Sequence, residues 1–384
     1  MKSRVVDYFI SLVKIDSESK DELAMAQRMR DDLTAMGAEV VFDNAHVKTK
    51  GNVGNLLARF SGQIDKEPLL LCSHLDTVKP GKGIKPIVKD GKIFSDGSTI
   101  LGADDKSGIV EIVEAIRRLQ ERQIAFAPIE VLLTISEEIG LFGGKNLDYS
   151  LLKAKTGYSL DSHRIGSVVI QAPTLNKFDI KVFGKESHSG ACPERGISAI
   201  QIAAEAISKL KLGRIDEETT ANIGIIKGGV ARNIIPNEVT LEGEVRSHNI
   251  EKLEKITGAI LNIFNETAQQ YQVEVKNQIY KSRVDSKVTN DFPALKIDKN
   301  EEVVKIALQA AENIGLEPKV EIGGGGSDSN IFYSHGLNIP ILGTGMQDVH
   351  SLKENISISD LEKGTLWIME IIKEYSKRGI RNIS

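Results

Sequence analysis

The distribution of apolar and polar residues predicts alternating helices and strands in both terminal parts of the chain. Apolar residues recur at helical spacing in some segments, and short apolar runs bounded by turn residues lie between them. Such alternation is typical of an α/β domain with a mixed, largely parallel sheet flanked by helices. Helices are expected at 3–15, 21–36, 109–119, 301–315 and 358–378, and strands at 38–47, 53–60, 68–73, 129–135 and 339–343.

The pattern changes after Thr174, where strands alternate strictly between apolar and polar residues. Phe178–Phe183 has the alternation of a half-exposed strand. The elements expected here follow the order β-α-β-β-α-β, which indicates a separate α+β sandwich inserted into the first domain. We therefore predict an insertion at 173–284 within a discontinuous domain at 1–172 and 285–384. Within the insertion, strands are expected at 178–183, 220–228, 236–247 and 272–281, and helices at 195–210 and 249–271.

Composition narrows the class of protein. The chain has 384 residues, of which 41% are hydrophobic and 27% charged, with a formal net charge of −4. Acidic and basic residues are intermixed, which argues against a nucleic-acid or membrane partner. Two distant cysteines, Cys72 and Cys192, favour a reducing compartment. The apolar patch Tyr8–Val13 is too short for a membrane span or a signal peptide, so we expect a cytoplasmic protein.

Polar residues follow the apolar run Leu69–Cys72, which is typical of a buried parallel strand that ends at a site. His74 and Asp76 are two residues apart, so in an extended segment they point to the same side. A carboxylate beside an imidazole suits a metal-bound histidine. Taken alone, the pair also fits an ordinary histidine with an incidental acidic neighbour.

The same placement recurs along the chain. Helix capping explains one aspartate of the pair Asp104-Asp105 but explains two less well. Adjacent glutamates after an apolar strand repel each other unless a positive charge lies beside them. Carboxylates and imidazoles that converge at strand ends can hold divalent metals. The residues in such positions are His74, Asp76, Asp104, Glu137, Glu138, Asp161 and His350.

Together these segments resemble the dizinc M20 metallopeptidases, and within that family the tripeptidase T branch. The resemblance covers nearly the whole chain, and five motifs occur in the expected order. It implies a zinc-exopeptidase type of catalytic domain and an inserted lid or dimerisation domain. The segments that carry it are Ser73–Val78, Gly102–Gly108, Thr134–Gly140, Asp161 and His350.

The resemblance also implies a set of metal ligands. Asp104 would bridge two divalent ions, with His74 and Asp161 completing one site and Glu138 and His350 the other. Zinc is the expected metal, with cobalt and manganese as alternatives, because cellular supply as well as affinity decides which ion is bound.

Two further residues receive catalytic roles from the resemblance. Asp76 would support His74, and Glu137 would be the general base that deprotonates the water bridging the ions. A general base needs a pKa suited to the working pH, and neighbouring charges can tune it in either direction.

The inserted domain supplies the expected substrate contacts. His188 matches a histidine that stabilises the oxyanion and that comes from the partner subunit in dimeric relatives. Arg246 matches an arginine that binds a substrate carboxylate, for which a guanidinium fork is suited. Asn233 matches a substrate-contacting asparagine. Each also fits an ordinary surface or strand residue. A homodimer through the inserted domain is expected.

The leading hypothesis is a dizinc aminopeptidase that hydrolyses short peptides, in the manner of a tripeptidase. An amidohydrolase that deacylates N-acyl amino acids is the close alternative, and a non-catalytic peptide-binding protein is an alternative of another class. The glycine run 323–326 lacks the spacing of a phosphate-binding loop. We expect it to mark close backbone packing near the cleft, with a bearing on substrate length.

Overall fold

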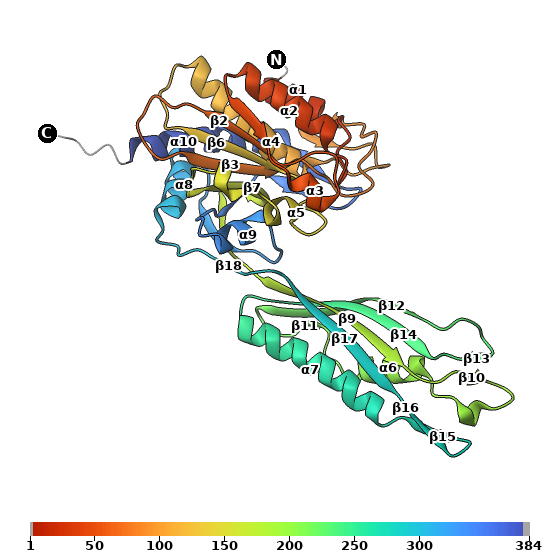
Figure 1. The fold of residues 1–384 in the computed structure, drawn as a ribbon. Helices are drawn as coiled ribbons and strands as arrows, with labels where there is room; N and C mark the ends of the chain where they lie inside the picture. Colours follow the sequence, from red (N-terminus) through yellow and green to blue (C-terminus); the bar gives the residue numbers. More distant parts are fainter. Residues whose placement is uncertain (1–2, 379–384) are drawn as a thin grey trace. The chain divides into compact units, whose positions relative to one another are not determined.

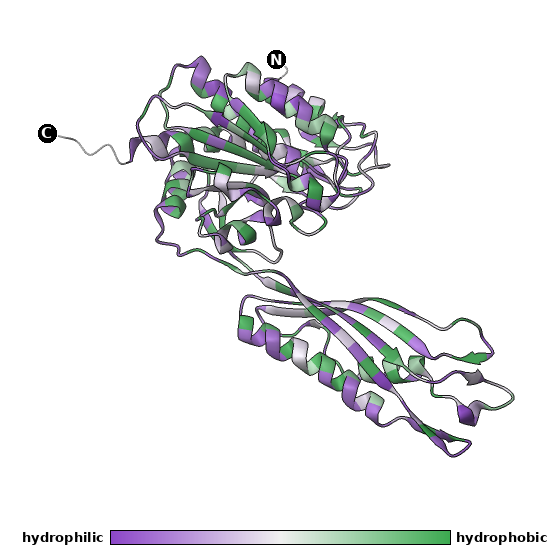
Figure 2. Cartoon of the chain, in the orientation of Figure 1, coloured by the Kyte–Doolittle hydropathy of each residue, from purple (hydrophilic) through white to green (hydrophobic). Residues whose placement is uncertain are grey.

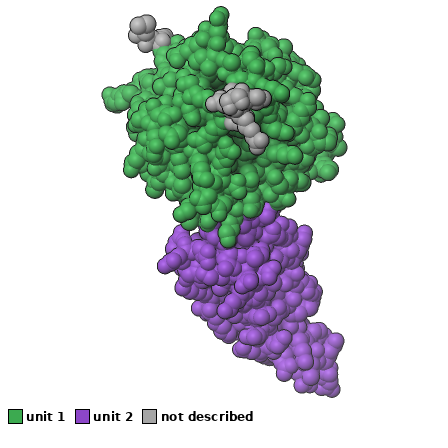
Figure 3. Space-filling view, turned by 90° about the vertical axis from the view of Figure 1, so that its left-hand side faces the viewer, with its two compact units in different colours: residues 1–172, 295–384 green, residues 173–294 purple. Residues whose placement is uncertain are grey.

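The computed structural model describes residues 3–378 and divides the chain into two compact units. Unit 1 comprises residues 1–172 and 295–384, and unit 2 comprises residues 173–294 (Figure 3). Unit 2 begins where the sequence analysis placed the insertion, but it ends at Ala294 rather than at residue 284. The predicted end is too early because strand β17 (Arg283–Phe292) pairs with β9 (Thr174–Phe183) and so belongs to the sheet of unit 2.

Unit 1 is built on a nine-stranded mixed sheet with the order β1-β2-β6-β3-β7-β20-β8-β18, and β19 pairs with β8. The neighbouring strands β6, β3, β7 and β20 run parallel, so their carboxyl ends share one edge. The predicted α/β class is confirmed. The strands are β1 (Glu39–Phe42), β2 (Leu56–Phe60), β3 (Leu69–His74), β6 (Ile129–Thr134), β7 (Thr156–Ile165), β8 (Ser167–Ala172), β18 (Leu295–Lys296), β19 (Lys319–Ile322) and β20 (Ile341–Gly343).

Helices cover both faces of this sheet (Figure 1). On β3, Leu69 and Leu71 join the larger apolar cluster, whereas Leu70 and Cys72 join a second cluster on the opposite face. A strand buried on both faces must be apolar at every position, which explains the continuous run and the apolar colouring of the central strands in Figure 2. The larger cluster includes α1 (Arg4–Val13), α2 (Leu23–Ala35), α4 (Ala103–Glu121), α8 (Glu302–Asn313) and α10 (Ile358–Lys377).

The remaining elements of unit 1 are short. A four-stranded sheet has the order β21-β22-β5-β4, and its β4–β5 hairpin turns at Asp90 and Gly91, both at positive φ. These elements are α3 (Ala45–Thr49), α5 (Phe142–Lys145), α9 (Asp328–Ser334), the 3₁₀ turn η1 (Tyr149–Leu151), and the strands β4 (Ile87–Lys89), β5 (Lys92–Phe94), β21 (Met346–Gln347) and β22 (Asn355–Ser357).

Two predicted elements of unit 1 differ from the structure. The strand expected at 38–47 ends at Phe42, because the Asp43 carboxylate accepts the N–H groups of Ala45 and Asn55 and turns the chain into α3. Asp161 was expected at the end of a strand. It lies instead inside β7, which continues to Ile165. Asp161 comes two residues after Ser159, the last residue of β7 that pairs with β3.

Unit 2 is a five-stranded antiparallel sheet, β11-β12-β14-β9-β17, with α6 and α7 packed together against it. The predicted α+β class and the β-α-β-β-α-β order hold. The strand expected at 272–281 is wrong, because Lys276 and Asn277 both have positive φ and fold it into a hairpin. The elements are β10 (Ser187–His188), η2 (Pro193–Arg195), α6 (Ala199–Ser208), β11 (Gly213–Arg214), β12 (Thr219–Gly228), β13 (Ile234–Ile235), β14 (Glu238–Ser247), α7 (Ile250–Gln269), β15 (Gln272–Val275) and β16 (Gln278–Lys281).

Candidate metal centre

The candidate site lies where the parallel strands of unit 1 end. His74 is the last residue of β3, and Glu137 and Glu138 follow the end of β6, its parallel neighbour. Asp104 lies at the amino end of α4, which packs against β3. The shared direction of the strands therefore brings residues from distant parts of the sequence to one edge of the sheet.

Asp104 lies between two imidazole rings. One carboxylate oxygen is 3.1 Å from Nε2 of His74, and the other is 3.2 Å from Nε2 of His350. The same His350 nitrogen is 2.9 Å from Oε2 of Glu138. The structure thus brings four of the five predicted ligands into direct contact through a central carboxylate.

The fifth predicted ligand, Asp161, belongs to the same region. Single donor atoms of His74, Asp105 and Asp161 lie within 4.8 Å of one another, and those of His74, Asp104 and Glu138 form a second such group. One carboxylate oxygen of Asp105 accepts the Ser73 hydroxyl at 2.5 Å, whereas the other is buried without a hydrogen-bond partner among residues 3–378. Two adjacent groups of oxygen and nitrogen donors fit a pair of divalent ions.

The electrostatics of the cluster also fit bound cations. Burial, with the neighbouring charge of Asp104, raises the pKa of Asp161 well above its ordinary value, and burial with Asp161 does the same for Glu137. Hydrogen bonds that the His350 ring donates to the Asp104 and Glu138 carboxylates raise the pKa of His350 to about 10. Carboxylates crowded into a buried site gain most from a positive charge placed among them.

The Asp76 carboxylate holds the turn that carries Glu137 and Glu138. It accepts the backbone N–H of Glu137 at 2.9 Å and that of Glu138 at 3.2 Å, and the Ser19 hydroxyl at 2.6 Å. For His74, the nearest acceptor to Nδ1 is the backbone oxygen of Asp76 at 3.0 Å, while the carboxylate lies at 3.4 Å. Asp76 therefore orients His74 largely through its main chain and uses its side chain to fix the glutamates.

Sequence reasoning missed two carboxylates that support this region. Glu22 accepts the N–H of Ser136 at 3.0 Å and its hydroxyl at 2.8 Å, and so holds Ser136 at a positive φ just before Glu137. Glu354 accepts three backbone N–H groups around Asp104. No local motif marks either residue. Their partners lie more than a hundred positions away, and only the fold reveals these contacts.

The predicted substrate contacts lie in unit 2. His188 and Asn233 are neighbours, since β10 pairs with β13 and the N–H of Ser189 donates to the Asn233 carbonyl at 3.0 Å. Arg246 lies on β14, where its guanidinium donates to Glu244 at 2.9 and 3.3 Å. Their roles remain predictions.

The glycine run packs closely at Gly323, where an added Cβ would lie 3.1 Å from the Val169 side chain, but not at the next two residues. A Cβ atom added to Gly324 or Gly325 would meet nothing within 4 Å, so these residues face open space. Close packing occurs just beyond the run, where the buried Asp328 carboxylate leaves no room for a side chain at Gly144. Burial raises the pKa of Asp328 to about 6.

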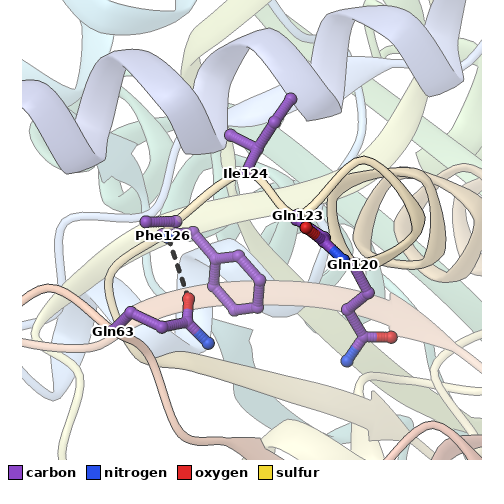
Figure 4. A pocket seen from close by; sticks show the side chains of 6 residues that line it. Gln63, Gln120, Gln123, Ile124 and Phe126 are labelled. Atoms are coloured by element: carbon purple, nitrogen blue, oxygen red, sulfur yellow. Dashed lines mark hydrogen bonds between the residues drawn. The ribbon is translucent and has the colours of Figure 1, made fainter.

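A cavity of 340 Å³ lies elsewhere in unit 1 (Figure 4). Its lining is uncharged, and Gln63 accepts the backbone N–H of Phe126 across it at 3.2 Å. Gln120 is at the carboxyl end of α4, about 24 Å along the helix from Asp104. The cavity therefore belongs to a different region. Its lining residues are Gln63, Gln120, Gln123, Ile124, Ala125 and Phe126.

Within residues 3–378, no helix combines the length and the apolar character needed to cross a lipid bilayer.

Comparisons with known proteins extend over the whole chain. The model of the peptidase dimerisation domain matches residues 173–272, and that of peptidase family M28 matches residues 55–171. An uncharacterised protein of Bacillus subtilis is 39% identical over 98% of this chain and 99% of its own length. Peptidase T of Brevibacillus brevis is 26% identical over 98% of this chain and 100% of its own.

Two solved structures are similar throughout. Aminopeptidase PepT from Bacillus cereus shares 40% identity over 97% of this chain and 98% of its own, with a TM-score of 0.87. A tripeptidase from Staphylococcus aureus shares 39% identity over 98% of both chains, with a TM-score of 0.92. This end-to-end similarity covers both the unit with the carboxylate–imidazole cluster and the unit matched by the dimerisation model, and the chain belongs to the M20 peptidases of the peptidase T type.

Proposed function

We propose that the protein is a metal-dependent aminopeptidase that hydrolyses short peptides, with tripeptides as the substrate class. The observation that carries the proposal is the Asp104 carboxylate held between His74 and His350, beside Glu137 and Glu138. This cluster occurs in a chain about as long as the similar aminopeptidase and tripeptidase and alike from end to end.

Five residues would hold two divalent ions, with zinc as the expected metal. Asp104 faces both imidazoles and is suited to bridge. Bound there, the ions would polarise the scissile carbonyl and favour deprotonation of a water molecule. The donor set consists of two imidazoles and three carboxylates, which suits zinc and also accommodates cobalt or manganese. The ligands are His74, Asp104, Glu138, Asp161 and His350.

Glu137 is the residue that moves protons. It is buried, and Asp76 fixes its backbone directly beside Glu138, one of the proposed ligands. It accepts a proton from the attacking water and returns it to the leaving amine, as a general base that becomes a general acid. Burial and Asp161 raise its pKa well above the ordinary value, whereas bound cations would lower it.

Arg246 and His188 are too far apart in one unit to contact the same short peptide. Arg246 pairs with Leu175 near the start of unit 2, whereas Glu238 lies at the other end of β14, about 26 Å along the strand. His188 and Asn233 belong to that far end (Figure 1). A tripeptide extends only about 10 Å. We therefore infer that Arg246 and His188 serve different sites of a dimer, and we propose, as the resemblance implies, that His188 and Asn233 serve the partner's site.

Such sharing needs a dimer, and β12 offers the surface for it. One edge of β12 pairs with β14 along its length. Its other edge pairs with the short strand β11 only at Thr220 and Ala221, so from Asn222 onward this edge has no strand partner among residues 3–378. An exposed apolar edge of this kind is suited to pair with another strand. We propose that the β12 strands of two copies meet here. The exposed apolar residues of this part of β12 are Ile225 and Ile226, and the exposed Val230 follows two residues after the strand.

The test combines one substitution with a substrate panel. Glu137→Gln is expected to lower kcat by about 10²–10⁴-fold while both ions stay bound. Glu317→Gln, on an exposed side chain, is the matched control. Wild-type protein loaded with zinc is assayed on dipeptides, tripeptides and N-acyl amino acids. Hydrolysis only of the N-blocked substrates would replace the proposal with a deacylase, and metal-loaded protein without any turnover would point to a binding protein.

A further inference from the structure

Glu354 connects two loops that are distant in the sequence. It is 1% exposed and lies directly before β22, four positions after His350. One carboxylate oxygen accepts the N–H groups of Leu101 and Gly102 at 2.6 and 2.8 Å, and the other accepts the N–H of Asp104 at 2.9 Å. Both oxygens are therefore engaged with the segment that carries Asp104.

These N–H groups need an acceptor from elsewhere in the chain. Gly102 is the residue that precedes α4, it has a φ of +75°, and it has no side chain that could accept from the first turn. An anion at a helix amino terminus also gains from the helix dipole. Capping by Glu354 thus accounts for part of its role, although it does not explain why the cap comes from beside His350.

The loop that carries His350 packs against the core through Val349, and among residues 3–378 its hydrogen bonds other than those of Glu354 and of the His350 ring are local. It connects β21 to β22, and both Asp348 and His350 have positive φ, at 51° and 58°. The His350 side chain is half exposed, yet its Nε2 atom lies within 3.2 Å of Asp104 and 2.9 Å of Glu138. A ring with so little packing around it depends on the anchors of its backbone for its position.

We propose that Glu354 is a positioning residue that sets the distance between His350 and Asp104. Its carboxylate binds the backbone of Asp104, and Glu354 itself belongs to the loop that carries His350. The two proposed ligands therefore keep a fixed separation before any ion binds. This inference rests on the proposed metal centre. Preorganisation of this kind determines how tightly a site holds its ion.

Glu130 offers a matched control. It is also a buried glutamate, 2% exposed, and it accepts the backbone N–H groups of Lys153 and Ala154 at 3.0 and 2.9 Å. It lies near the start of β6, at the opposite end of the strand from Glu137. Replacing it removes comparable backbone hydrogen bonds, and an ion pair with Arg59 at 3.3 Å, without touching a proposed ligand.

The experiment compares Glu354→Gln with Glu130→Gln in the full-length protein. The amide of Gln offers one acceptor oxygen in place of two, so at least one backbone bond is lost at residue 354. Zinc affinity is measured by competition with a chromophoric chelator, and amide hydrogen exchange is followed at residues 101–104. Glu354→Gln is expected to weaken the affinity for one of two ions by about 10- to 100-fold and to speed exchange at 101–104. Glu130→Gln is expected to lower the melting temperature and leave zinc affinity unchanged.

Each outcome decides a separate question. If the wild-type protein binds no zinc, the proposed function fails. If it binds two ions and Glu354→Gln binds both with wild-type affinity, Glu354 is only a helix cap and the inference is overturned. Glu354→Asp keeps both acceptor oxygens on a side chain one methylene shorter. It is expected to fold and to show a smaller loss of affinity, and wild-type affinity in this variant would also contradict the proposal.

Discussion

The Asp76 carboxylate accepts the backbone N–H of Glu137 at 2.9 Å. Its second oxygen accepts the N–H of Glu138, so one buried side chain fixes both glutamates at the end of β6. The two glutamates have opposite tasks, since Glu138 faces His350 whereas Glu137 is the proposed base. Asp76 thus keeps the backbones of the proposed base and of a proposed ligand at a constant separation.

Replacing Asp76 with Asn is expected to impair catalysis more than folding. The amide nitrogen of Asn cannot accept a hydrogen bond, so one of the two glutamates loses its anchor. We expect kcat to fall by about 10- to 100-fold with a smaller change in KM, and two ions per chain to remain by elemental analysis. Asp285→Asn, at an exposed residue of unit 2, is the control. A variant with full kcat would show that the turn holds its shape without Asp76.

Glu111 predicts a pH-dependent stability. It is 1% exposed in α4, and its Oε1 atom has no hydrogen-bond partner among residues 3–378. Burial, with Asp105 and Asp360 nearby, raises its pKa well above the ordinary value. The folded protein therefore holds this proton to higher pH than the unfolded chain, so stability falls as pH rises above about 4.3, the unfolded value.

Glu111→Gln removes the group that titrates and is expected to stabilise the protein at high pH. The gain in the free energy of unfolding should be on the order of 1–3 kcal/mol at pH 8 and should shrink toward pH 4. Urea denaturation at several pH values measures it, with Glu317→Gln as the exposed control. An advantage that is constant with pH would mean that packing against Gly364, rather than charge, limits stability at this position.

Much of the fold followed from sequence periodicity, and the failures have physical causes. The run Leu69–Cys72 predicted a strand buried on both faces, and the structure agrees. Strand β17 escaped detection because its residues are mostly exposed and polar, so it shows no apolar alternation. The hairpin at 272–281 was read as one strand because its two strands share the same alternation, and only the positive φ of Lys276 and Asn277 divides them.

The candidate site was more predictable than its supports. Ligand-type residues at strand ends are visible in a sequence because His74 and Glu138 are unusual neighbours for apolar runs. Glu22 and Glu354 are ordinary acidic residues in loop-like contexts. What distinguishes them is the backbone N–H groups they accept, and those contacts arise only when distant segments are brought together by the sheet.

A charge on the β12 edge should separate the proposed dimer. Ile226 is 53% exposed, and Ile226→Lys would place an ammonium group where the partner strand is expected to lie. We expect the dimer dissociation constant to rise at least about tenfold, as measured by sedimentation equilibrium. Ile279→Lys is the control, because Ile279 is similarly exposed on the β15–β16 hairpin. Equal dissociation constants for both variants and the wild type would exclude β12 from the interface.

Mixing two inactive variants tests whether His188 acts across the dimer. Glu137→Gln lacks the base but keeps His188, and His188→Ala has the reverse defect. In a mixed dimer, shared sites give one active centre that has Glu137 from one chain and His188 from the other. We expect activity to return after the two variants are mixed under conditions that allow subunit exchange, to at most about a quarter of the wild-type level at equal concentrations, because half of the dimers are mixed and each has one complete site. Adding Ile226→Lys to both chains should abolish the recovery, since it prevents pairing. If His188 serves its own subunit, each site carries one defect whatever its partner, and the mixture stays as inactive as its components.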